Sequence, residues 1–418
     1  MAGSASVRGL ARVALVLGAL APSACSPTTD SLGYDETASL TLTPLTPLGS
    51  YPNPFRDLLG QTPAAITAKI TNAFNTIFHG DPSTQAIYVP VGTNEAYIQD
   101  VLHNDIRTEG IGLAMMVCVQ VNKQDEFDKL WTYAKAVLEI QSGANAGYFP
   151  SFCDGADGTP APCLDPYGFQ QFVMALILAH DRWNDTSGAN DYGADALALF
   201  HTLRHKEDDN GGVVDGVTNT FDPIANLPLD VPNVSAAGVT RPSIVMPGYY
   251  ALWAQAAADP TWTATAAAGR TFLPTSANAT TGLTPVRSAF DGTPSPGWAT
   301  FLPEGYRTQI NLVIDQIWTS GSAWNVTENN QLLAFFSGQG INTYGTSYTL
   351  DGVLTNPARE PSLVVANGIS AAISTNADRA SYVNAVWNMD PPSGQARYYV
   401  GILQLVALLI LGGQFQIY

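Results

Sequence analysis

Apolar residues recur along most of this chain at the three-to-four-residue spacing of helices that bury one face. This spacing predicts twelve helices, which are separated by segments rich in Gly, Pro, Asp and Asn. The predicted ranges are 63–78, 110–122, 125–140, 168–181, 191–203, 245–258, 263–272, 306–318, 328–337, 360–374, 378–387 and 399–412. Strand-like alternation is scarce, so the pattern predicts an all-α fold.

The domain organisation follows from the same pattern. No Pro/Ser-rich linker divides the chain after residue 50, which favours one domain over residues 51–418. Twelve helices in one domain suggest six helical hairpins in a toroid, with loops and helix starts converging at one end. Two long loops without regular pattern, at 143–166 and 206–243, are of the kind that usually carries function.

The N-terminal segment has the form of a bacterial export signal. Two arginines precede a short apolar run at 13–21, and small residues follow up to Cys25. This arrangement predicts a signal peptide over 1–25 with a lipobox, in which Cys25 becomes the lipidated first residue of the mature chain. Residues 26–50, rich in Thr, Ser, Pro and Gly, are typical of a flexible tether. We therefore expect an exported protein, either a cell-envelope lipoprotein or a secreted one.

Charge and motifs narrow the possible partners. The formal net charge is −17, so nucleic acid is a poor partner, and we expect membrane attachment only through a lipid on Cys25. Neutral glycans are compatible with this charge. The chain has no GxGxxG, P-loop or HExxH motif, and we expect neither a cofactor nor a metal. The sequence does not indicate an oligomeric state.

Two cysteines lie ten residues apart in a loop rich in Gly, Pro and Asp. In an oxidising compartment, Cys153 and Cys163 predict a local disulfide. A zinc site is less favoured, because no His or third Cys lies nearby in the sequence.

The segment with the clearest chemistry is Asp105–Gly110, which runs into the apolar stretch 111–119. It places Glu109 on the first turn of a helix that is expected to be buried. Desolvation raises the pKa of such a carboxyl, which makes Glu109 a candidate general acid. Ordinary helix capping is the alternative, since a carboxylate is also favoured at a helix start.

Further motifs follow this segment in a fixed order. They are Phe127–Trp131, Gly147–Phe149, Ala179–Trp183, Tyr250–Trp253, Thr281–Pro285, Phe290–Pro294, Trp387–Asn388, Arg397–Tyr399 and Gly412–Phe415. With the Asp-x-Arg-Thr-Glu-Gly pattern, they resemble glycoside hydrolase family 8, most of all its reducing-end xylose-releasing exo-oligoxylanases. The resemblance implies an (α/α)6 barrel. It also implies inverting hydrolysis of β-1,4-linked glycans or their oligosaccharides, with xylan first and glucan or chitosan next.

The resemblance also implies roles for two carboxylates. In the family, a Glu protonates the leaving oxygen and an Asp across the cleft activates water. Glu109 falls on the acid position. The position of the base falls on Glu304, which is the candidate general base although the family has Asp there. The extra methylene moves the carboxylate by about one bond length, and a misplacement of about 1 Å can cost roughly 100-fold in rate.

Other residues are expected to bind substrate or to support the carboxylates. These candidates are Asp105, Arg107, Tyr148, Asp165, Tyr167, Tyr306 and Arg307. The first two are expected to orient Glu109, and Tyr148 and Tyr167 to form sugar platforms. Tyr167 stands where the family has an Asp, for which Asp165 is a candidate substitute.

A second departure from the family lies at Ile244, which replaces a Tyr that the exo-oligoxylanases place near the nucleophilic water. These substitutions leave a second hypothesis open. In it the chain is a catalytically degenerate member that acts as a glycan-binding or structural surface lipoprotein.

Overall fold

The computed structural model describes residues 41–154, 159–160, 163–184 and 190–418. The predicted signal peptide, Cys25 and most of the predicted tether lie outside the described residues. The described part belongs to one compact unit, Leu40–Tyr418.

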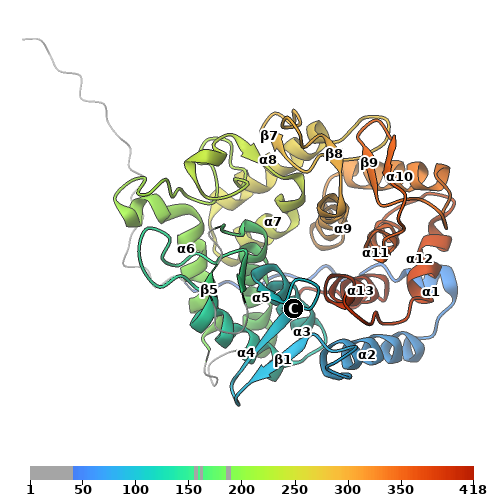
Figure 1. Cartoon of the computed structure of the whole chain (residues 1–418), viewed down its shortest axis with the longest axis horizontal. Coiled ribbons are helices and arrows are strands. Elements are labelled where there is room, and N and C mark those ends of the chain that lie inside the picture. The colour runs from blue at the N-terminus through green and yellow to red at the C-terminus, as the bar shows by residue number, and fades with distance from the viewer. Residues whose placement is uncertain (1–40, 155–158, 161–162, 185–189) are drawn as a thin grey trace, which may run out of the picture. The chain divides into compact units, whose positions relative to one another are not determined.

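Helices dominate this unit, as the apolar spacing predicts. Six of them are almost entirely buried: α3 (Thr108–Gln120), α5 (Pro166–Trp183), α7 (Pro247–Ala256), α9 (Tyr306–Thr319), α11 (Pro361–Ser370) and α13 (Arg397–Leu411). Each packs against the next in this order, and α13 packs against α3, as their neighbouring positions in Figure 1 illustrate. Helices that are apolar on every side are stable only when protein surrounds them, which explains why this set forms the core.

A second set of helices pairs with the first. It comprises α2 (Pro63–His79), α4 (Gln124–Tyr133), α6 (Tyr192–Asn210), α8 (Pro260–Ser276), α10 (Ala323–Gly338) and α12 (Arg379–Trp387). These pack against α13, α3, α5, α7, α9 and α11, respectively. All twelve predicted helices are confirmed. The structure adds α1 (Pro54–Leu59), which packs against α12 and is too short to show a periodic pattern.

Short strands and turns that the sequence did not predict connect the helices. Strands β1 (Tyr88–Val91), β2 (Glu95–Asp100), β3 (Asp105–Arg107), β4 (Phe152–Asp154) and β5 (Thr159–Pro160) form an antiparallel sheet in this order. A second sheet has three strands in the order β10 (Leu354–Asn356), β9 (Ser347–Thr349) and β8 (Thr300–Phe301). In a third sheet, β6 (Val239–Thr240) pairs with β7 (Ser288–Ala289). Further turns are the π-helix Ala134–Leu138 and the 3-10 turns η2 (Val234–Ala236), η3 (Pro242–Ile244) and η4 (Pro303–Gly305). Strand β3 leads directly into α3, and η4 directly into α9, so two connections deliver polar residues to helix starts.

The end of the predicted tether is part of the helical unit, which corrects the 26–50 boundary. Leu42 and Leu45 are buried in the core, and the Leu45 backbone N–H donates to the Asp181 carboxylate at 2.9 Å. Burial of two leucines is enough to fix a short segment that composition alone marks as flexible.

The predicted disulfide is absent from this part of the structure. Cys163 carries a free thiol, which donates to the Leu164 carbonyl at 3.7 Å. The strand register explains the separation: Cys153 lies opposite Pro160, whereas the Cys163 carbonyl accepts from the Ser151 backbone N–H. The two cysteines are therefore offset along the hairpin, with Cys153 buried and Cys163 exposed.

No helix in the described ranges combines the length and apolar character needed to cross a bilayer. The most apolar candidate, α13, has 15 residues, all of them buried except Tyr399.

One buried acid predicts how stability responds to pH. Glu328, on α10, is 3% exposed, and its Oε1 has no hydrogen-bond partner in the described part of the chain. Burial raises the pKa of Glu328 to about 8. The folded protein thus keeps this proton while the unfolded chain, with a Glu pKa of about 4.3, loses it.

We expect the free energy of unfolding to fall by about 1.4 kcal/mol per pH unit between roughly pH 4.3 and pH 8 because of this group. Glu328→Gln removes the contribution and raises stability above pH 8 relative to the wild type. Denaturant titrations at several pH values measure the slope. The same slope in both proteins would contradict the prediction.

Candidate active site

An arginine held by two aspartates supports the start of α3. The Arg107 guanidinium contacts both carboxylate oxygens of Asp105 at 3.0 Å and the Asp100 carboxylate at 3.0 Å. Two-point arginine–carboxylate contacts are strong and fix the plane of both groups. The structure therefore places Asp105 and Arg107 as a rigid support immediately before Glu109.

Glu109 lies on the first turn of α3 with 12% of its side chain exposed. Burial raises its pKa, Asp165 and Glu304 add to the rise, and Arg307 and Arg107 oppose it. A helix start alone would lower the pKa of a carboxyl. The net rise therefore favours the proton-donor hypothesis over the capping hypothesis, and α3 has no side-chain cap bond at its start.

Glu304 lies on the turn η4, two residues before α9 begins at Tyr306, and its side chain is 33% exposed. Its carboxylate contacts the Arg241 guanidinium at 2.5 Å. Burial alone would raise its pKa, but Arg241, then Arg307 and Arg287, outweigh burial, and the pKa is lowered. Glu304 is thus held as an anion, the form that accepts a proton.

Arg307 lies between the two acids. Its Nη2 is 2.5 Å from Glu109 Oε1, and its Nη1 is 3.9 Å from Glu304 Oε1. Because one guanidinium spans the gap, these oxygens are no more than about 9 Å apart, compatible with the roughly 6.5–9.5 Å of inverting glycosidases.

Asp165 and Tyr167 lie beside Arg307, at the start of α5. Asp165 caps this helix, accepting from the backbone N–H groups of Tyr167 and Gly168 at 3.0 and 3.1 Å. Burial raises its pKa, while Arg241 and Arg307 oppose the rise. Tyr167 is 3% exposed, and its ring lies under the Arg307 guanidinium at 4.5 Å. The ring thus supports Arg307 and presents no open face, which corrects the expectation of a sugar platform.

Two other tyrosines also lie in the core. Tyr148 is 1% exposed and donates to the Thr218 carbonyl at 2.7 Å. Tyr306 is fully buried and donates to the Thr346 carbonyl at 2.6 Å. The expected substrate-binding roles of Tyr148 and Tyr306 are therefore corrected to packing roles.

The sequence reasoning missed an ion-pair network behind Glu304. Arg241 Nε contacts Asp230 at 2.7 Å, and Arg287 Nε contacts the other oxygen of Asp230 at 3.0 Å. Arg241 and Asp230 come from the long loop that was expected to be functional. The available signal was a pair of isolated arginines in a chain with only 13% charged residues.

Tyr399, from α13, completes the surroundings of Arg307. Its ring centre is 5.9 Å from the guanidinium, and its hydroxyl donates to the Pro303 carbonyl at 3.5 Å. Burial raises the pKa of Tyr399 to about 12, so the phenol stays neutral. It matched a family motif but was not assigned to the site.

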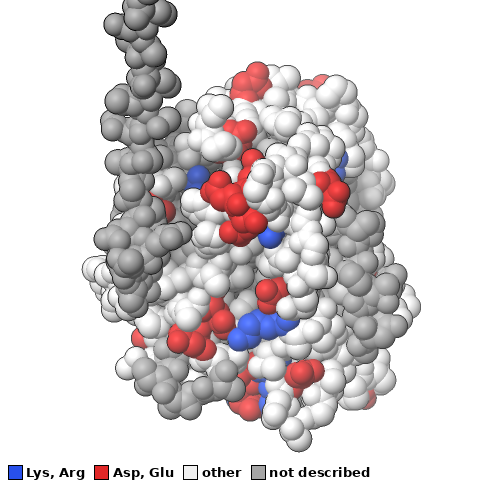
Figure 2. Space-filling view, turned by 90° about the vertical axis from the view of Figure 1, so that its left-hand side faces the viewer, with Lys and Arg blue, Asp and Glu red and all other residues white. Residues whose placement is uncertain are grey.

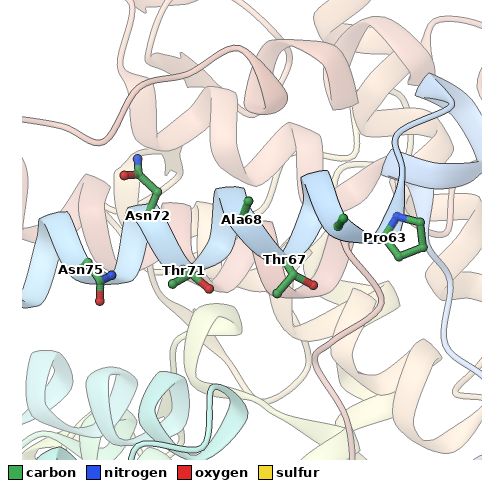
Figure 3. Close-up of a pocket in the computed structure, with 7 residues that line it drawn as sticks. Pro63, Thr67, Ala68, Thr71, Asn72 and Asn75 are labelled. Atoms are coloured by element: carbon green, nitrogen blue, oxygen red, sulfur yellow. The ribbon is translucent and has the colours of Figure 1, made fainter.

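A separate hollow of about 750 Å³ lies on the outer surface of α2. Figure 3 shows it along the helix, where Thr67, Thr71 and Asn75 project in a row. Its lining contains no acid or base, so it offers no chemistry for hydrolysis.

A buried acid of raised pKa that faces an ion-paired carboxylate of lowered pKa is the arrangement that acid–base cleavage of a glycosidic bond requires. Residues 91–413 match the family model described as Glycosyl hydrolases family 8. The chain belongs to this family.

Individual relatives agree with this assignment. The chain is 32% identical to the reducing-end xylose-releasing exo-oligoxylanase Rex8A of Paenibacillus barcinonensis, covering 88% of this chain and 97% of the relative. It is 23% identical to endoglucanase C of Ruminiclostridium cellulolyticum, covering 74% of this chain and 64% of the relative.

Solved structures agree as well. A Rex8A mutant in complex with 3(3)-alpha-L-arabinofuranosyl-xylotetraose superposes with a TM-score of 0.82 at 31% identity, over 88% of this chain and 97% of that one. A family 8 xylobiose complex from Teredinibacter turnerae superposes with a TM-score of 0.82 at 31% sequence identity. The match covers 88% of this chain and 98% of that one.

Removing the positive charge beside Glu304 tests the electrostatics of the site. In Arg241→Gln, burial of Glu304 is opposed by fewer cations, so we expect its pKa to rise. The acidic limb of the pH–rate profile then moves to higher pH. Carbon-13 NMR of the glutamate carboxyls measures the pKa of Glu304 directly. An unmoved Glu304 resonance would show that Arg241 does not set this pKa.

Proposed function

We propose that the chain hydrolyses β-1,4-linked glycans or their oligosaccharides with inversion, with Glu109 as general acid and Glu304 as general base. The single observation that carries this proposal concerns the two acids beside Arg307: the pKa of Glu109 is raised, whereas the pKa of Glu304 is lowered. The raised pKa of Glu109 favours donation of a proton, and the lowered pKa of Glu304 favours the anion that accepts one.

The reaction needs one proton transfer at each carboxylate. Glu109 donates its proton to the glycosidic oxygen as the bond to the anomeric carbon breaks. Glu304 removes a proton from the water whose oxygen attacks that carbon from the opposite face. Afterwards Glu304 releases a proton to solvent and Glu109 takes one up. Arg307 holds both carboxylates in place, and Asp105 and Arg107 fix the backbone that carries Glu109.

The first substrate class is xylan and its oligosaccharides. The names of the most similar relatives, reducing-end xylose-releasing exo-oligoxylanases, support it. Glucan comes next, because endoglucanases are more distant relatives, and chitosan remains a lower-ranked candidate. Most of the surface in Figure 2 is neither acidic nor basic, which suits a neutral polysaccharide.

The degenerate alternative is not favoured. Both carboxylates are present on either side of one guanidinium, and Arg241 fixes the longer side chain of Glu304. Ile244, where the exo-oligoxylanases have Tyr, is fully buried, and its carbonyl accepts from Gln170 and Tyr250. Its side chain therefore fills the core and leaves the acid–base pair unchanged.

The proposal extends to the architecture. Six helical hairpins would form the (α/α)6 barrel of the family, with the buried helices inside. The pairwise contacts from α3 through α13, and of α13 with α3, support this arrangement.

Glu109→Gln tests the acid. We expect hydrolysis of xylo-oligosaccharides to fall by about 10³-fold, because general acid catalysis typically contributes 10²–10⁴-fold. Proton NMR of the wild-type reaction should show the α-anomer as first product of a β-linkage. Glu360→Gln, at the start of α11, is a matched control that keeps full activity. Activity that survives Glu109→Gln, or a β-anomeric product, would overturn the assignment.

We also propose that the protein is exported and anchored by a lipid on Cys25. The charged, apolar and small-residue order of the N-terminal segment supports this. Expressed in a bacterial host, the wild type should partition into the membrane fraction and incorporate labelled fatty acid, whereas Cys25→Ser should do neither. Equal amounts of the wild type and Cys25→Ser in the membrane fraction would contradict the lipid anchor.

A further inference from the structure

Trp298 differs from the other aromatic residues of the chain. It is 39% exposed and is the one exposed Trp, Tyr or Phe side chain among residues 41–154, 159–160, 163–184 and 190–418. The other tryptophans and tyrosines of these ranges are buried or half-buried. Leaving a large apolar ring in water has a cost, so its position requires an explanation.

Trp298 also lies at a specific place, just before strand β8 and the turn that carries Glu304. Its carbonyl accepts from the Val286 backbone N–H at 3.1 Å, which fixes the loop at both ends. The indole is therefore attached to the base side of the proposed site.

Arg287 holds the indole from one face. The Arg287 guanidinium lies 4.3 Å from the centre of the Trp298 ring. Its Nε contacts Asp230 at 3.0 Å, so the arginine is tied to the same aspartate as Arg241. With one face covered by a fixed guanidinium, the exposed area of the indole belongs to its other face and its edges. Flat apolar faces of this kind stack against pyranose rings.

The most exposed cation of the network offers a contact for an acidic ligand. The arginines Arg241, Arg287 and Arg307 are linked through the carboxylates of Asp230 and Glu304, and Asp165 and Glu109 lie beside Arg307. Arg287 is the outermost of the three, with 37% of its side chain exposed. The exposed part of this guanidinium is accessible to a further carboxylate, a group that guanidinium ions bind with two-point geometry.

From this juxtaposition we infer that Trp298 and Arg287 form a sugar subsite for a uronosyl unit on the glycan. The pyranose stacks on the open face of Trp298, and its carboxylate pairs with Arg287. The inference rests on the proposed function, since it names a substituent of the glycan that is proposed to bind beside Glu304.

Titration calorimetry in the Glu109→Gln background tests the subsite without turnover. The ligands are xylotetraose and a xylotetraose that carries one glucuronosyl substituent. We expect the acidic ligand to bind about tenfold more tightly at low salt, as one added charge-assisted contact predicts. Arg287→Gln should abolish this preference, and Trp298→Ala should weaken both ligands by about tenfold.

Arg359→Gln is the matched control, because Arg359 also stacks on an aromatic ring, Tyr344, at 4.4 Å. It should leave both affinities unchanged, and melting temperatures verify that all variants are folded. Equal affinity for the two ligands, a preference that survives Arg287→Gln, or unchanged binding in Trp298→Ala would overturn the subsite.

The two proposals fail separately. A wild type that cleaves neither oligosaccharide contradicts the proposed function, whereas cleavage without acidic preference contradicts only the subsite.

Discussion

The candidate site depends on one buried guanidinium, that of Arg307. Only 10% of this side chain is exposed, and it contacts one carboxylate at 2.5 Å and a second at 3.9 Å. A buried cation is stable only with partners in contact, and Arg307 has carboxyl oxygens of Glu109 and Glu304 beside it. The pKa values of the two acids nevertheless move in opposite directions. Burial dominates at Glu109, whereas a second arginine at Glu304 reverses the effect of burial.

The surrounding helices are arranged to hold this guanidinium. Arg307 is the second residue of α9, and its charged plane rests on Tyr167 at the start of α5. Close approach of α5 to α3 depends on Gly168, where an added Cβ would lie 2.5 Å from the Glu109 backbone nitrogen. Any larger residue would push the two helices apart and separate Tyr167 from Arg307. Tyr167, which stands where the family has an acid, thus supports the guanidinium of Arg307 with its ring.

The twelve long helices could be predicted from the sequence because a helix of three or more turns repeats its apolar spacing often enough to be recognised. The strands, of two to six residues, and the six-residue α1 repeat nothing and were missed. Within the site, Glu109, Glu304 and Arg307 could be predicted because they lie in local motifs. Arg241 could not, since its contact with Glu304 joins residues 63 positions apart. Tyr148 and Tyr306 were misassigned because burial of a tyrosine depends on distant neighbours.

The presence of Glu304 instead of Asp need not displace the base. A glutamate has one more rotatable bond than an aspartate, and its carboxylate position is therefore less well determined by the backbone. Here the far end of the side chain is fixed by Arg241 at 2.5 Å, and Arg241 is fixed by Asp230 at 2.7 Å. Asp230 is shared with Arg287, so the base is located by a chain of ion pairs and not by the length of its own side chain. Shortening Glu304 to Asp would withdraw the carboxylate from Arg241 and leave a buried cation without one partner. The longer acid and its arginine are therefore a coupled pair, and the effect of changing one depends on the other.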